Sequence, residues 1–157
     1  MGSNTGSPGT LIIGLGNPLR GDDGVGVRVV QALSTQTLPA DLDVVDGGTQ
    51  GLGIVSLLEG RDRVIVIDAA DVGLAPGQYL RFELDEANLL GADRHVSIHA
   101  AGLRDALMLA QALKVLPEKV IIYGMQPASL DWDRELSSEV EAALPSLVAA
   151  VLEEATI

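Results

Sequence analysis

The stretch from Leu11 to Arg28 passes from an apolar run through a glycine-rich turn into a helical pattern. The run ends at Leu15, and apolar residues then recur at helical spacing as far as Leu33. In an open α/β sheet such a turn lies beyond the carboxyl end of a strand, where ligands bind. Turns of this kind commonly bind phosphate, but Asp22 and Asp23 would repel an anion. The turn therefore predicts a cation site.

Short β-rich runs alternate with helical segments along the chain, which indicates a mostly parallel sheet covered by helices. The expected strands are residues 11–15, 42–45, 63–68, 78–83 and 119–123, and the expected helices begin near Asp23, His99 and Arg134, with a short one through Leu57 and Leu58. Residues 63–68 are apolar almost throughout, as is typical of a central strand buried on both faces. Residues 69–77 leave no room for a crossover helix, so the strand at 78–83 is expected to be antiparallel.

The length of 157 residues predicts one α/β domain over residues 11–157. Residues 1–10 are rich in small and polar side chains, and we interpret them as a disordered head or a remnant of expression. The last expected helix, residues 134–154, contains Pro145, which is expected to kink it.

The composition excludes several classes of function. Ten basic and 22 acidic residues give a net charge of −12, which opposes binding to nucleic acid or to an anionic membrane. No apolar run approaches the roughly 20 residues that span a bilayer, and the first residues lack the features of a signal peptide. The chain contains no cysteine, which excludes disulfides, thiolate metal sites and cysteine nucleophiles and fits a cytoplasmic protein.

Three candidate metal ligands follow or precede elements that are expected to end at one edge of the sheet. These are Asp23 in the first turn, Asp68 at the end of the central strand, and His99 at the start of a helix. Two carboxylates and one imidazole suit nickel, zinc, manganese or iron, and leave coordination positions open for water or substrate. The acid at 68 follows a buried run, where an unpaired charge is costly unless a cation meets it.

Each candidate also has a structural interpretation. Asp22 and Asp23 could cap the first helix, and Asp22 is the better candidate for that role. Asp68 could accept hydrogen bonds from backbone N–H groups of the glycine-rich loop at 46–51. His99 could begin a helix with its ring hydrogen bonded elsewhere.

Four parts of the sequence together resemble a known family. Residues 14–26, Asp46-Gly47-Gly48-Thr49, Ile67-Asp68-Ala69 and His99 follow the order and spacing of the hydrogenase maturation endopeptidases, and the likeness extends from about residue 11 to residue 153. The resemblance implies a three-layer, phosphorylase/hydrolase-like fold with a five-stranded twisted sheet between helices. It also implies an endopeptidase that removes the C-terminal extension of the nickel–iron hydrogenase large-subunit precursor after nickel insertion.

The resemblance implies roles for individual positions. Asp23, Asp68 and His99 fall on the catalytic and nickel-binding set; Asp46, Gly47, Gly48, Thr49 and Gln50 fall on a substrate-binding rim; and Asn17 and Asp22 have supporting places. The implied partner is the precursor, and we expect the protein to act as a monomer. We expect nickel to come with the substrate, although zinc or another divalent metal could occupy the free protein.

Two mechanisms are compatible with these residues. A metal bound by the protein could polarise the scissile carbonyl and activate water, or the three residues could bind nickel already held in the precursor while an aspartate acts as base. We favour the second, because the chain lacks a His-Glu-x-x-His motif and three ligands from loops need not hold metal tightly. A chaperone that binds the same precursor without cleaving it is the alternative function.

Peptidyl-tRNA hydrolases share the Gly-Leu-Gly-Asn-Pro opening at residues 14–18. That family places a catalytic histidine soon after this motif, whereas the first histidine of this chain is His95. The charge of −12 also opposes tRNA binding. The sequence therefore disfavours an esterase of this type.

Overall fold

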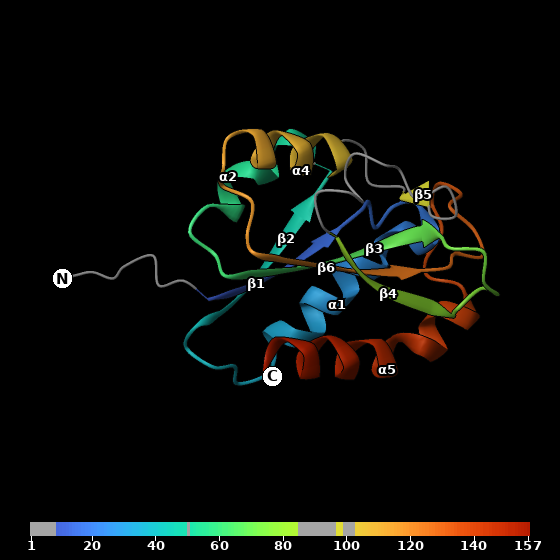
Figure 1. Cartoon of the computed structure of the whole chain (residues 1–157). Helices are drawn as coiled ribbons and strands as arrows, with labels where there is room; N and C mark the ends of the chain where they lie inside the picture. The colour runs from blue at the N-terminus through green and yellow to red at the C-terminus, as the bar shows by residue number, and fades with distance from the viewer. Residues whose placement is uncertain (1–8, 50, 85–96, 99–102) are drawn as a thin grey trace.

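The computed structural model describes residues 9–49, 51–84, 97–98 and 103–157 (Figure 1). In this part of the chain, five strands form the main sheet in the order β2-β1-β3-β6-β4, and a short strand, β5, pairs with β3. Their bounds are β1 Thr10–Leu15, β2 Leu42–Gly48, β3 Arg63–Asp71, β4 Tyr79–Leu84, β5 Ser97–Ile98 and β6 Lys119–Met125. Strands β2, β1, β3 and β6 are parallel, and β4 runs antiparallel to β6. The predicted mixed sheet with an antiparallel fourth strand is confirmed.

Helices cover both faces of the sheet, so the fold has three layers, as expected (Figure 1). Helices α1 (Val25–Ser34) and α5 (Ser138–Ala155) lie on one face, and α2 (Val55–Leu58) and α4 (Leu103–Ala112) lie on the other. Two 3₁₀ turns, η2 (Gly21–Gly24) and η3 (Gly51–Ile54), lead into α1 and α2. Among the described residues, no helix combines the length and the apolar character needed to cross a membrane.

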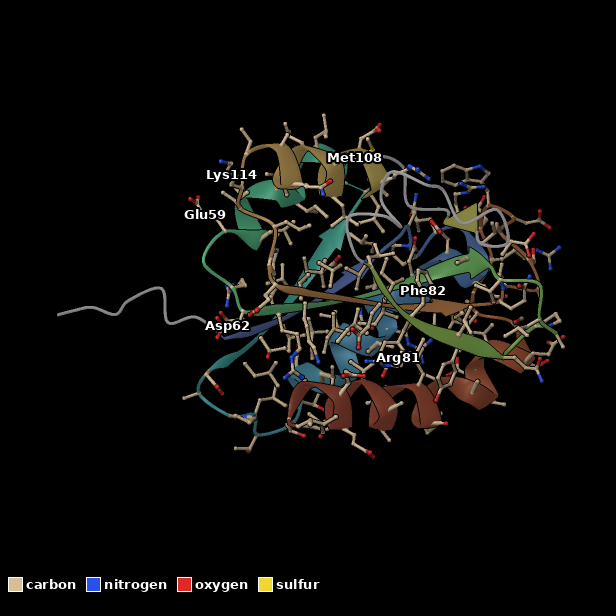
Figure 2. All side chains as sticks on the ribbon, in the orientation of Figure 1. Glu59, Asp62, Arg81, Phe82, Met108 and Lys114 are labelled. Atoms are coloured by element: carbon tan, nitrogen blue, oxygen red, sulfur yellow. The ribbon has the colours of Figure 1, made fainter. Side chains whose placement is uncertain are left out.

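Alternation along the strands divides the apolar residues between two cores. In β1, Ile12 belongs to the core under α1 and α5, whereas Leu11 and Ile13 belong to the core under α2 and α4. Strand β4 follows the same rule: Figure 2 shows Arg81 on the side of α5 and Phe82 on the opposite side of the sheet. Burying each large aliphatic side chain contributes about 1.5–3 kcal/mol, so the central strands anchor both cores.

Several element boundaries differ from the sequence prediction. The central strand does not end at Asp68 but continues to Asp71, because β6 pairs with it as far as Ala69 and β5 pairs with the last two residues. Strand β2 likewise continues to Gly48, since Asp46 and Gly48 pair with Gly14 and Leu15 of β1 across a register shift. Pairing with neighbouring strands thus extends both strands beyond their apolar runs.

The last helix begins at Ser138, four residues later than predicted, because Ser137 is its N-cap and accepts a hydrogen bond from the N–H of Val140 at 3.3 Å. The helix continues through Pro145 to Ala155. The helix predicted to begin near residue 99 is described as α4 only from Leu103 to Ala112, and residues 99–102 lie outside the described part of the chain.

A buried carboxylate fastens the end of α5 to the sheet. Glu154 Oε1 accepts hydrogen bonds from Arg81 Nε on β4 at 2.5 Å and from the Tyr123 hydroxyl on β6 at 3.1 Å. The hydrogen bond from Arg81 lowers the pKa of Glu154, and burial raises the pKa of Tyr123 to about 12. This cluster stabilises the fold on the face that carries α5.

Candidate functional site

Two glycines, one in the turn after β1 and one in the first turn of α1, allow this region to pack closely. Gly16 has a φ of +117°, and a Cβ there would lie 1.9 Å from the backbone oxygen of Asp23. A Cβ on Gly26 would lie 2.4 Å from the carbonyl oxygen of Ile67 and 2.5 Å from that of Leu15. The start of α1 can therefore press directly against β1 and β3, which brings the turn over the carboxyl ends of both strands.

Asp23 lies in η2 and is only 6% exposed. Its Oδ2 accepts a hydrogen bond from the backbone N–H of Asn17 at 2.8 Å, and its own N–H donates to the carbonyl of Arg20 at 3.1 Å. Its Oδ1 is buried and has no hydrogen-bond partner among the residues that the structure describes. Buried polar atoms are almost always hydrogen bonded, so this oxygen has the character expected of a ligand for a cation.

Asp68 is fully buried in β3, the strand next to β1. It pairs with Gly124 of β6, and its Oδ1 accepts a hydrogen bond from the N–H of Ala69 at 2.9 Å. The 3₁₀ turn that contains Asp23 packs against β3. The structure thus places two of the three predicted ligands on elements that contact each other at the carboxyl edge of the sheet.

The third predicted ligand, His99, and the predicted substrate residue Gln50 lie outside the described residues. Ile98, which precedes His99 in the sequence, pairs with Ala70 of β3, two residues beyond Asp68. Within the described ranges, no group of three or more histidine, cysteine, aspartate or glutamate side chains is arranged to hold a metal ion. The full ligand set predicted from the sequence therefore stays a prediction.

Asp22 has a different role from the helix cap that the sequence suggested. The 3₁₀ turn has no side-chain cap, and the buried Asp22 carboxylate reaches a distant loop instead. Its oxygens accept hydrogen bonds from the N–H groups of Ala128, Ser129 and Ser137 at 2.8, 3.2 and 2.7 Å, and from the Ser137 hydroxyl at 2.9 Å. Asp22 therefore fixes the loop before α5 against the turn that carries Asp23.

The predicted substrate-binding residues Asp46, Gly47, Gly48 and Thr49 lie at the end of β2 and just after it. Asp46 and Thr49 are exposed, and Asp46 Oδ1 accepts a hydrogen bond from the N–H of Gly48 at 2.8 Å. The carbonyl of Gly48 in turn accepts from the N–H of Gly16 at 2.9 Å. This segment borders the turn of the candidate site, while contact with substrate stays a prediction.

The sequence reasoning did not predict the contacts of two residues, one that positions the site and one that holds the chain after β3. Ser137 joins Asp22 to the first turn of α5, and Gln126 accepts hydrogen bonds from the N–H groups of Val72 and Leu74 at 2.8 and 3.3 Å. No local pattern reveals the first contact, because its partners lie 115 residues apart in the sequence. The polar Gln126 directly after a buried strand was the available signal for the second.

Comparison with known proteins assigns this arrangement to a family. Residues 27–154 match the family model HycI, hydrogenase maturation protease. The hydrogenase 2 maturation protease of Escherichia coli K12 is 34% identical over 144 residues, which cover 90% of this chain and 87% of that protein. The hydrogenase expression/formation protein HupD of Rhizobium leguminosarum bv. viciae is 36% identical over 144 residues, covering 90% of this chain and 71% of that protein.

Solved structures agree with the sequence matches. The hydrogenase maturating endopeptidase HybD from E. coli superposes with a TM-score of 0.81 at 32% identity, covering 93% of this chain and 91% of that chain. The five-stranded mixed sheet with helices on both faces is therefore shared with this relative. The sequence resemblance, the family match and the fold all lead to one assignment: the chain belongs to the hydrogenase maturation protease family.

Proposed function

We propose that this protein removes the C-terminal extension of a nickel–iron hydrogenase large-subunit precursor once nickel has been inserted. The family is one of peptidases that act in hydrogenase maturation, which supports hydrolysis of a peptide bond. The observation that carries the proposal is the Asp23 carboxylate, which is buried beside β3 and keeps one oxygen without a hydrogen-bond partner among the described residues.

We propose that Asp23, Asp68 and His99 bind the nickel of the precursor. Carboxylates and imidazole are suitable ligands for nickel, and Asp23 and Asp68 come from elements in contact. Pairing of Ile98 with Ala70 supports the inclusion of His99, since it joins the sequence just before this histidine to the strand of Asp68. The substrate's metal then orients the precursor, so only a loaded precursor is aligned for cleavage.

Hydrolysis requires a water oxygen to form a bond to the scissile carbonyl carbon and a proton to reach the departing amine. A carboxylate can accept the proton from the attacking water and return it to the amine when the C–N bond breaks. We assign this base role to Asp23 or Asp68, because both are acidic and buried next to the proposed nickel site. The low exposure of both residues keeps bulk water from competing for the carboxylates.

We propose that the precursor backbone approaches the site along Asp46, Gly47, Gly48, Thr49 and Gln50. Glycines permit close approach of a peptide, and Gly48 is linked by a hydrogen bond to Gly16 of the site turn. Asn17 holds Asp23 through its N–H, and Asp22 holds the facing loop. Both therefore act as positioning residues.

Mass measurement of the precursor tests the proposal. Purified protein incubated with nickel-loaded precursor should release one C-terminal peptide, and the precursor should lose the mass of that free peptide minus one water molecule, because hydrolysis adds one water across the broken bond. Co-purification with a precursor of unchanged mass would instead support the non-cleaving chaperone. No shortening and no binding would reject both functions.

A further inference from the structure

Two large apolar side chains are exposed next to the turn that carries Asp23. Leu19 and Trp132 are each 61% exposed, and Trp132 is the sole tryptophan of the chain. Single exposed apolar residues are ordinary on protein surfaces. Aromatic, arginine and aliphatic side chains gathered beside a functional site are instead typical of the residues that dominate binding to a partner.

Leu19 and Trp132 come from segments that are far apart in sequence but are joined in the fold. The N–H of Asp133 donates to the carbonyl of Leu19 at 2.8 Å. The Arg20 guanidinium carbon lies 5.2 Å from the centre of the Trp132 ring, and Arg20 Nε donates to the carbonyl of Leu130 at 3.3 Å. We call Leu19, Arg20 and Trp132 the Leu19–Trp132 surface.

This surface is held in place by hydrogen bonds that are shielded in part from solvent. The N–H of Gly21 donates to the carbonyl of Arg134 at 2.9 Å, and the Asp22 carboxylate accepts four hydrogen bonds from the loop that contains Trp132 and from its end at Ser137. A surface ordered before binding loses less conformational entropy when a partner docks. The loop thus presents its apolar side chains in a fixed arrangement.

The Leu19–Trp132 surface is continuous with the candidate site. The carbonyl of Arg20 accepts the N–H of Asp23, and the Asp23 carboxylate accepts the N–H of Asn17 at the other end of the same short turn. A precursor segment that reaches Asp23 therefore also lies close to Leu19, which belongs to the same turn. Asp131 and Asp133, on either side of Trp132, are exposed, and so is Glu135. These acidic side chains outnumber Arg20 and Arg134, so the edge of the surface carries net negative charge.

We propose that the Leu19–Trp132 surface docks the large-subunit precursor, taking an apolar side chain that is flanked by basic groups. This inference rests on the proposed function and adds a specificity surface outside the nickel site. The apolar residues supply affinity, and the neighbouring aspartates select positive charge in the docked segment. The negative net charge of the whole chain favours the same kind of partner.

Fluorine NMR of protein labelled with 5-fluorotryptophan tests docking directly. The labelled protein gives one signal, because Trp132 is the only tryptophan, and an unlabelled precursor adds no fluorine signal. Adding nickel-loaded precursor to the Asp23→Asn variant, which we expect to leave the precursor uncleaved, should shift or broaden this signal. A signal that does not change at saturating precursor would overturn the proposal.

Processing kinetics provide a second test with a matched control. Leu19→Ser and Trp132→Ala should each raise the KM for precursor by about tenfold and leave kcat within about twofold, as expected for loss of a binding hot spot. Leu113→Ser is the control, since Leu113 is 58% exposed and precedes Lys114, which lies at the opposite end of the sheet in Figure 2. An unchanged KM in both surface variants, or an equal rise in the control, would overturn the proposal.

Substitution of Asp133 tests whether the negative charge of the surface selects basic groups in the docked segment. This residue has a φ of +58°, a conformation that asparagine tolerates well, so Asp133→Asn removes charge without straining the loop. The variant should show a weaker dependence of KM on salt than the wild type; an identical dependence would overturn the selection of basic groups. Failure of the wild type to cleave any precursor would reject the proposed function, whereas cleavage with unchanged KM in the variants rejects docking alone.

Discussion

Asp22 and Asp23 are neighbours in the sequence, both are buried, and their carboxylates have opposite surroundings. Asp22 accepts four hydrogen bonds from residues of the loop before α5. Asp23 accepts one from Asn17 and keeps a buried oxygen without a partner in the described part of the chain. A carboxylate saturated by the protein stabilises a fold, whereas one that keeps an oxygen open can bind something else.

Another buried carboxylate, Glu154, lies near the C-terminal end of α5. Its carboxylate accepts hydrogen bonds from Arg81 and Tyr123, so its charge is balanced within the protein, as that of Asp22 is balanced by donors. Removal of one partner leaves the other unsatisfied, and the cost is smaller where that partner is exposed to solvent. We therefore expect replacement of Asp22, Asp23 and Glu154 to have different effects on activity and on stability.

The largest effect is expected on catalysis at Asp23 and Asp68. Asp23→Asn and Asp68→Asn should each reduce the rate of precursor processing by about 10²–10⁴-fold, because each removes a charge that we propose to bind nickel and a carboxylate that we propose as proton acceptor. Both variants should keep the melting temperature or raise it, since functional residues are often not optimal for stability. Single-turnover processing assays and thermal unfolding measure the two outcomes.

Asp71→Asn is the matched control, because Asp71 lies on the same strand as Asp68 but is exposed. It should process the precursor at the wild-type rate. If Asp68→Asn unfolds the protein instead of inactivating it, Asp68 is an acceptor for backbone donors and not a ligand.

The second largest effect is expected on stability at Asp22. Asp22→Ala should lower the free energy of unfolding by about 3 kcal/mol, because it leaves several buried donors without an acceptor. Urea denaturation measures this change. If Asp23→Asn lowers the free energy of unfolding as much as Asp22→Ala does, the two carboxylates do not differ in their contribution to stability.

The smallest effect is expected at Glu154. Glu154→Gln should lower the unfolding free energy by about 1 kcal/mol near neutral pH, a modest value because the Arg81 side chain is 39% exposed and screened by solvent. The folded-state pKa of Glu154 is lowered below 4.5, so the wild type has this stability above pH 4.5 and loses it as the pH falls through the lowered pKa.

Denaturation curves at several pH values test this dependence. The difference in stability between wild type and Glu154→Gln should shrink as the pH is lowered below about 4.5. A difference that grows on acidification would contradict the assigned direction of the pKa shift.

The sequence predicted the layers and strand directions because they depend on local pattern. Continuous apolar runs identified the central strands, and the short connection after Asp68 identified the antiparallel strand β4. The ends of β2 and β3 were wrong because pairing with other strands, which no local pattern encodes, extends them to Gly48 and Asp71.

The site was predictable only in part for a related reason. Both acids of the first turn are visible in the sequence. Which of them is saturated with hydrogen bonds depends on the loop around Ser129 and Ser137, which is more than 100 residues away. A helix-cap role for Asp22 was a reasonable local interpretation that long-range hydrogen bonds override. Only the folded structure identifies Asp23 as the acid whose carboxylate keeps an oxygen without a hydrogen-bond partner among the described residues.

We propose that the Asp23 carboxylate, together with Asp68 and His99, binds the nickel of the substrate. The most direct measurement mixes enzyme and precursor after each has been separately stripped of metal or loaded with nickel, and follows precursor length by mass spectrometry. We expect metal-stripped enzyme to cleave nickel-loaded precursor, and we expect nickel-treated enzyme to leave nickel-free precursor intact. Cleavage of nickel-free precursor by metal-loaded enzyme, with no cleavage by stripped enzyme, would contradict it and establish a metallopeptidase centre held by the protein itself.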